Sequence, residues 1–249
     1  MSSFINAVRS SFTVRELITP RDQLETADDA EDAFRKMEDG GFEVIPRSDP
    51  RVINSYWRRG CLHEVEIKRE QLVGLGLPIV ATIQLLADQD FLFVVGGRGV
   101  DGYIHRSDLN RPAVKIVLFA YFEHAERVMF ETIKTSLTID SLNGKIGEKR
   151  HGEVTKAHER MVARGTDHSW SGLLYFREVL ELAHDEQKRP LPACRWHLNT
   201  FRNRVAHGDQ ELIMRPNDVT KLKLVVDELE LIIRAFDAPR RTSAASSRR

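Results

Sequence analysis

The sequence predicts an α+β N-terminal module, residues 1–111, followed by an all-α helical bundle, residues 112–238. Two observations predict this fold class. The order helix, strand, turn, strand occurs twice in the first half, about 50 residues apart, as expected for two similar units packed together. From residue 112 onward, apolar residues instead recur at the spacing of long helices. The 249 residues suffice for two domains of ordinary size.

The composition is typical of a cytoplasmic globular protein. Hydrophobic residues make up 41% of the chain and charged residues 30%, and no stretch approaches the roughly 18 apolar residues that span a bilayer. The N-terminus lacks the apolar core of a secretory signal, and Cys61 and Cys194 show no pairing pattern, so we expect reduced thiols. Because 37 basic residues balance 37 acidic ones, a nucleic-acid partner must be argued from a local site.

The first copy of the repeated unit begins with a helix over residues 29–38. Its apolar residues share one helical face, and Gly40 and Gly41 follow as a stop signal. A strand over residues 42–46, a polar turn over 47–50 and a second strand over 51–57 complete this copy.

The second copy repeats this order. Pro78 suits the start of a helix that runs to residue 88, and strands over residues 91–95 and 100–105 flank a glycine-rich turn. In our alignment of the two copies, Phe42 matches Phe91 and Tyr56 matches Tyr103. Each copy alone is too small to bury a good core, so the two are expected to pack together.

Three glycines in the second copy match the dinucleotide-binding fingerprint: Gly97, Gly99 and Gly102. That fingerprint requires a helix N-terminus to meet the pyrophosphate, whereas Tyr103 and the residues after it continue a strand. The segment therefore predicts a hairpin turn.

The second half predicts five helices. The first runs over residues 112–137, and three more are expected over residues 148–163, 170–184 and 192–207. The last helix carries a single apolar stripe made of Leu222, Val225, Val226, Leu229, Ile232, Ile233 and Phe236. We expect the first and last helices to pack in one bundle, and the basic tail, residues 239–249, to be disordered.

The first half resembles a pair of CBS domains. The resemblance covers about residues 12–111 and is carried by the duplicated unit and by its ending, GYIHRSDL at residues 102–109. In that family two such units form a Bateman module that usually binds adenine nucleotides. The resemblance therefore implies an adenine nucleotide as a regulatory ligand.

The family's pattern places the ribose hydroxyls on the residue that matches Asp108. His105 stands where the family usually has threonine, and His105 or Arg106 could offer donors to phosphate. Ser107 completes the candidate nucleotide-binding set. The alternative is that Ser107 or Asp108 only caps the helix that follows. The first copy has no aspartate at the matching place, so we expect at most one ribose site per chain.

The segment LNTFRNRVAH, residues 198–207, carries the most informative motif of the second half. At 100° per residue, Leu198, Phe201 and Val205 form the core face of a helix, and Asn203 and His207 lie together on the opposite face. A histidine at the end of a helix, before a glycine, can also be explained by its favourable interaction with the negative pole of the helix dipole.

Residues 112–238 resemble HEPN domains, whose motif is Arg, four to six residues, then His, often with Asn after the Arg. Arg202, Asn203 and His207 match this motif with four residues between Arg and His. Many members of that family are metal-independent endoribonucleases. The resemblance implies that His207 takes a proton from a ribose 2′-hydroxyl, that Arg202 stabilises charge on the phosphate, and that Asn203 orients one of them.

On an ideal helix Arg202 lies about 140° from His207, too far for one face. Either the helix end is distorted or a second subunit completes the site. HEPN sites commonly lie at a two-fold interface and CBS pairs tend to dimerise, so the two resemblances imply a homodimer.

Two functions follow from the sequence. The first is a ribonuclease regulated by an adenine nucleotide, an architecture that by analogy suits stress or phage defence. The second is a non-catalytic sensor whose helical domain only dimerises or binds another protein. The sequence has no zinc-binding, P-loop or serine-hydrolase motif, so we expect no metal and no cofactor for catalysis.

Overall fold

The computed structural model describes residues 3–49, 51, 54–61, 63–97, 99–165 and 169–237. It combines helices with two small sheets, so the α+β class is confirmed. By their internal contacts the residues divide into two units. We call Asn6–Leu118 with His207–Lys223 the sheet unit, and Phe119–Ala206 with residues 3–5 and 224–237 the helical unit. The predicted domain boundary after residue 111 stays a prediction.

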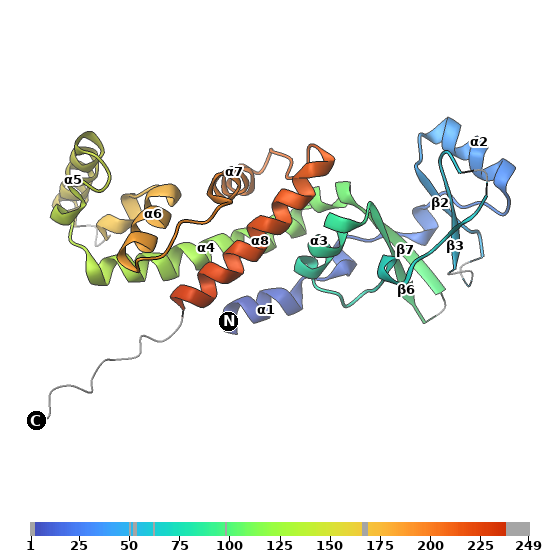
Figure 1. Ribbon diagram of the computed structural model, residues 1–249, viewed down its shortest axis with the longest axis horizontal. Coiled ribbons are helices and arrows are strands. Elements are labelled where there is room, and N and C mark those ends of the chain that lie inside the picture. Colours follow the sequence, from blue (N-terminus) through green and yellow to red (C-terminus); the bar gives the residue numbers. More distant parts are fainter. Residues whose placement is uncertain are drawn as a thin grey trace, which may run out of the picture. The chain divides into compact units, whose positions relative to one another are not determined.

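The sheet unit contains a four-stranded mixed sheet (Figure 1). Its spatial order is β1 (Thr19–Pro20), β7 (Gly99–His105), β6 (Phe91–Gly96) and β5 (Leu72–Gly74). The β5–β6 pair is parallel and the other two pairs are antiparallel. Both long central strands were predicted, and the short edge strands β1 and β5 were not.

A three-stranded antiparallel sheet lies in the same unit. It has the order β2 (Val44–Pro46), β3 (Ser55–Arg58) and β4 (Val65–Glu66). Helix α2 (Ala30–Gly40) packs on this sheet, with Met37 and Trp57 in one buried cluster. Asp29 caps the N-terminus of α2. Gly41 ends the helix with a positive φ of 71°, in agreement with the predicted glycine stop. Residues 52 and 53 of the predicted second strand lie outside the described residues.

The two sheets share an aromatic cluster. Tyr56 of β3 contacts Phe91 and Phe93 of β6 with ring centroids 5.2 and 5.4 Å apart, and Phe91 stacks on Tyr103 of β7 at 5.5 Å. The repeated units thus pack together through their β-hairpins, as expected from the duplication.

The predicted alignment of the two copies is wrong by two residues in one strand. In the second copy, Phe91 pairs with His105, which follows Tyr103 by two residues. The matching position in the first copy is Arg58, which follows Tyr56 by two residues. Arg58 pairs with Val44 and not with Phe42. A shift of two residues keeps the same side chains on the same face, so alternation along the strand does not distinguish the two registers.

The glycine-rich segment forms the predicted hairpin. Gly96 pairs with Gly99, and β7 continues antiparallel to β6 where a dinucleotide fingerprint would need a helix. A bulge at Asp101 shifts the register between Val94 and Val95. Residue 98, within the turn, lies outside the described residues.

Helix α3 (Ile79–Asp88) follows Pro78 and completes the second copy. After β7, the short helix η4 (Arg106–Asn110) leads into the long helix α4 (Pro112–Ser136). Helix α1 (Ser3–Ser11) was not predicted.

The helical unit contains four further helices, of which α5 starts and ends as predicted. They are α5 (Glu148–Ala163), α6 (Phe176–Glu186), α7 (Arg195–Ala206) and α8 (Pro216–Phe236). Unit boundaries fall within α1, α4 and α8, so each of these three helices contributes to both units, and a further boundary follows the last residue of α7. The predicted helix over residues 170–184 is instead a short η6 (Trp170–Leu173) followed by α6.

Helices α4 and α8 pack together within the helical unit, as predicted. Tyr121 is buried on α4 and its hydroxyl lies 3.5 Å from Glu230 of α8. The apolar stripe of α8 is buried along its length. Phe122 of α4 meets Phe176 of α6 edge to face at 5.7 Å.

Arg150 ties α5 to the segment before α6. Its guanidinium donates to both carboxylate oxygens of Glu178, at 2.8 and 3.1 Å, and to the carbonyl of Leu173 at 2.7 Å. It also lies 4.0 Å above the ring of Tyr175. Fork-shaped pairing of this kind is specific to arginine.

Among the described residues, no helix is both long enough and apolar enough to cross a bilayer. Cys61 and Cys194 are both free thiols. The predicted disordered tail, residues 239–249, lies outside the described residues.

Candidate functional site

Helix α7 presents the predicted motif on its exposed side. Leu198, Phe201 and Val205 are buried, as the helical geometry predicted. Asn203 is exposed, and so is His207, which directly follows the last helical residue. Two of the three side chains that the motif assigns to chemistry, Asn203 and His207, are therefore open to solvent.

Arg202 points instead toward α4. Its Nε lies 3.2 Å from Oε1 of Glu126, whose side chain is only 14% exposed. Burial raises the pKa of Glu126, and the charge of Arg202 partly offsets this increase. Arg202 is thus held by a partly buried carboxylate, and 37% of its side chain remains exposed.

The turn that follows α7 is held by a lysine far away in the sequence. In the sheet unit, Lys115 Nζ donates to the carbonyls of Gly208 and Gln210 at 2.7 and 2.6 Å. The amide of Gln210 also donates to the carbonyl of His207 at 3.1 Å. His207 therefore begins a turn with defined backbone contacts.

The second candidate set, at the end of β7, forms a helix cap. The backbone N–H of His105 donates to Asp108 Oδ2 at 2.8 Å, and the N–H of Ser107 donates to Nδ1 of His105 at 3.2 Å. The other oxygen of Asp108 accepts from Arg111 at 3.0 Å. These contacts agree with the alternative that Asp108 caps the helix that follows. Each carboxylate oxygen of Asp108 can still accept a further hydrogen bond.

Arg106 caps the end of helix α3. Its Nε donates to the carbonyls of Leu86 and Gln89 at 2.9 and 3.2 Å. These carbonyls belong to the last turn of the helix and the residue after it, where a cation is favoured by the helix dipole. The guanidinium also pairs with Asp90 at 2.9 Å.

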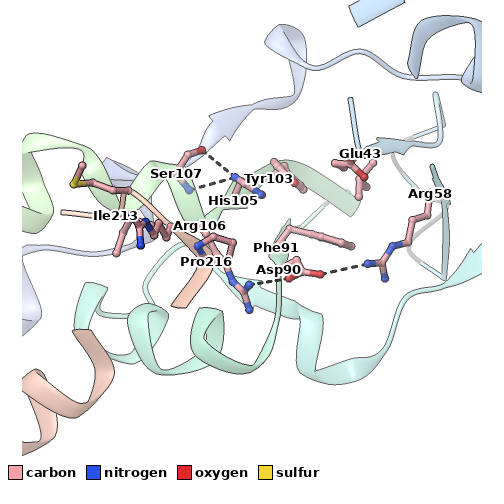
Figure 2. A pocket seen from close by; sticks show the side chains of 13 residues that line it. Glu43, Arg58, Asp90, Phe91, Tyr103, His105, Arg106, Ser107, Ile213 and Pro216 are labelled. Carbon is pink, nitrogen blue, oxygen red and sulfur yellow. Dashed lines mark hydrogen bonds and ion pairs between the residues drawn. The ribbon is translucent and has the colours of Figure 1, made fainter. Parts of the chain in front are cut away.

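A hollow of about 300 Å³ in the sheet unit brings several of these side chains together (Figure 2). Asp90 lies between two arginines there, pairing with Arg106 at 2.9 Å and with Arg58 at 3.3 Å. His105 lines the same hollow, and its ring stacks on Tyr103 with an angle of 9° between the planes. The volume is at the lower end of the range of about 300–1,000 Å³ for small-molecule sites.

One wall of the hollow comes from the segment after α7. Asn110 Oδ1 accepts from the amide of Ile213 at 2.7 Å, and its Nδ2 donates to the carbonyl of the same residue at 3.0 Å. This pairing places Met214 and Arg215 against the hollow. The charged residues of the lining are Arg58, Arg106, Arg215, Glu43 and Asp90. Arginines thus outnumber carboxylates in this lining.

A second hollow, of about 370 Å³, lies on the sheet unit beside the first. The two share His105 and Ser107 in their linings, but Asp108 lines only the second. The predicted nucleotide-binding residues are therefore close together, while Arg106 and Asp108 line different hollows.

No family model, curated protein sequence or solved structure matches the chain. The resemblances to CBS pairs and HEPN domains therefore stay predictions.

Sequence reasoning missed the partners of the predicted residues. Glu126 precedes Arg202 by 76 residues, and Lys115 precedes Gly208 by 93. Asp90 and Arg58 line a hollow that forms where the two hairpins pack together. No local signal in the sequence marked Glu126 as a partly buried residue.

Proposed function

We propose that the chain is a metal-independent endoribonuclease of the HEPN type, with Arg202, Asn203 and His207 as its catalytic residues. The observation that carries the proposal is the exposure of Asn203 and His207 on a helix whose apolar residues are buried. A substrate can reach these two side chains without any opening of the core.

The chemistry suits the residues. A neutral histidine accepts the proton of a ribose 2′-hydroxyl, and the 2′ oxygen attacks the adjacent phosphorus. The bond from phosphorus to the 5′ oxygen breaks, which leaves a 2′,3′-cyclic phosphate and a 5′-hydroxyl whose proton comes from solvent. An arginine beside the phosphate stabilises the added negative charge. Arg202 has this role in the proposal.

A homodimer belongs to this proposal. Arg202 is held toward Glu126, away from the exposed side of α7 that carries Asn203. A second subunit would supply another copy of each residue. Light scattering should give twice the mass of one chain, and a monomer at assay concentration would contradict this part.

The direct test of catalysis compares purified protein with its His207→Ala variant on mixed RNA in EDTA. His63→Ala is the matched control, because His63 is also exposed and lies outside the motif. We expect the unmodified chain and the control to cleave, and His207→Ala to lose activity. Cleavage by all three proteins alike would exclude His207 from the reaction.

The hollow of Figure 2 supports a second function, regulation by a bound adenine nucleotide at a CBS-like module. Its lining combines the stacked Tyr103 and His105 rings with an excess of arginines over carboxylates. A base can stack on the rings, and phosphate can take up guanidinium donors such as Arg58, whose pair with Asp90 is about half exposed on both sides.

Thermal melting with AMP, ADP and ATP tests this function. We expect a nucleotide to raise the melting temperature of the unmodified chain, and Arg58→Ala to reduce the shift. Arg51→Ala is the control, because Arg51 is exposed and pairs with Asp49 outside the hollow. A nucleotide that fails to shift the melting of the unmodified chain would remove the sensing function.

A further inference from the structure

Trp196 is a large aromatic residue at the exposed start of α7. Its side chain is 58% exposed, whereas Trp57 is only 6% exposed. It lies one turn before Asn199 and two turns before Asn203 on the same helix. At 100° per residue these three side chains lie within about 60° of one another, so they share one face.

Two cations flank the indole ring. The guanidinium of Arg177 on α6 lies 5.0 Å from the ring centroid, and that of Arg195 lies 5.9 Å away. Arg177 also pairs with Glu181 at 2.8 Å, with both side chains more than a third exposed. Exposed pairs of this kind contribute little to stability, so the arginine is free to change partner. We call Trp196, Arg177, Arg195 and Asn199 the Trp196 platform.

The charge of α7 favours an anionic partner. The helix carries Arg195, Arg202 and Arg204 and has no acidic residue, and of these arginines Arg202 is paired with Glu126 of α4. This local excess contrasts with the zero net charge of the whole chain. Polynucleotide binding depends on such local phosphate neutralisation.

We infer that the Trp196 platform binds single-stranded RNA and leads it along α7 toward Asn203. A base stacks on the indole ring or on the guanidinium above it, and the arginines neutralise phosphates. The seven residues from Trp196 to Asn203 span about 10 Å of helix, which about three stacked nucleotides cover. The inference rests on the proposed function and names the class of its substrate.

The composition of the platform favours RNA over a protein partner. Centres of protein interfaces are enriched in Trp and Arg but depleted of Glu. Beside Trp196 and Arg177 lies the partly exposed carboxylate of Glu181, which is disfavoured at such a centre. The apolar residues beneath them, Phe176 and Leu180, are already buried. A stacked base needs only the ring and the cations, which are the exposed parts.

The test measures RNA binding separately from cleavage. All proteins carry His207→Ala, so that the RNA stays intact, and the probe is a fluorescent single-stranded RNA of about 12 nucleotides at fixed ionic strength. We expect Trp196→Ala to weaken binding about tenfold and Trp196→Phe to retain most of the affinity. Leu231→Ala is the matched control, because Leu231 is a 57% exposed apolar residue of α8 in the same unit.

The outcomes separate this inference from the proposed function. If RNA binding depends on Trp196 but the unmodified chain cleaves no RNA, the platform is supported and the proposed nuclease activity is excluded. Cleavage that depends on His207, with RNA affinity and KM unchanged in Trp196→Ala, would overturn the platform alone. Absence of RNA binding by the His207→Ala parent would also overturn it, as would a loss of the dimer in Trp196→Ala with unchanged RNA affinity.

Discussion

Gly102 lies where β7 runs beside β1, and this position has no room for a side chain. A Cβ there would come within 2.5 Å of the Ile18 side chain and of the backbone oxygen of Thr19. Because a backbone atom cannot move aside as a flexible side chain can, we expect Gly102→Ala to lower the free energy of unfolding by about 1–3 kcal/mol. Urea denaturation measures this. Gly97→Ala, in open space on the same hairpin, should be nearly neutral, and an equal loss in both would contradict the packing argument.

Two buried histidines predict how stability depends on pH. Burial lowers the pKa of His124, with a further decrease from Arg127, and burial likewise lowers the pKa of His184. A group with a depressed pKa in the folded state stabilises the fold above its unfolded pKa, and this contribution is lost as the pH falls. We therefore expect the melting temperature to decrease as the pH drops below the ordinary histidine pKa of 6.5.

Substitution of His124 tests whether this residue causes the pH dependence of the melting temperature. His124→Gln removes a titrating group and keeps an acceptor for Arg127, which donates to Nδ1 at 2.8 Å. The variant should show a flatter profile between pH 8 and about pH 5. His63→Gln, at an exposed position, should retain the slope of the unmodified chain. A profile that stays unchanged in His124→Gln would show that other groups cause the pH dependence.

At the scale of elements, the contact between α4 and α7 depends on Glu126 and Arg202. Arg202→Ala leaves the half-buried carboxylate of Glu126 without its cation, so we expect a loss of roughly 1–2 kcal/mol, reduced because Arg202 is partly exposed. In the double variant that carries Arg202→Ala and Glu126→Gln, the neutral glutamine should recover part of the lost stability. Chemical denaturation of the four proteins gives the coupling energy, and strictly additive effects would show that the pair contributes nothing.

The last helix could be predicted because its apolar spacing is long and regular, and the stripe of α8 is buried. Residues 148–163 were predicted as a charged helix, and α5 has the same bounds with Val154 as its buried residue. The strands β1 and β4 have two residues each, too few for any alternation to appear. Phe42 and Phe91 were matched by residue type, yet Phe42 is 40% exposed and Phe91 is 3% exposed, because pairing with the second strand fixes the register.

The candidate site could be predicted only in part. Helical geometry was enough to place Asn203 and His207 away from the core face. It also indicated that Arg202 points elsewhere, but it did not identify Glu126 as the residue that Arg202 meets. Likewise, the sequence left open whether Asp108 binds a ligand or caps η4, and only the contacts of its two oxygens show that it caps.

At the scale of the whole molecule, two kinds of site occur in one chain. The sheet unit has a hollow lined by stacked rings and arginines, and α7 of the helical unit carries an exposed polar motif with an exposed tryptophan. In our proposal the first binds a nucleotide and the second meets RNA. The central claim is the chemistry of His207, which requires a free 2′-hydroxyl on the substrate.

The most direct test compares an RNA with its 2′-O-methyl counterpart in EDTA, for the unmodified chain and for His207→Ala. We predict that the unmodified chain cuts only the RNA and leaves a 2′,3′-cyclic phosphate, detected by mass spectrometry of the fragments, and that His207→Ala cuts neither. Cleavage of the 2′-O-methyl substrate, or equal cleavage of RNA by both proteins, would contradict the account.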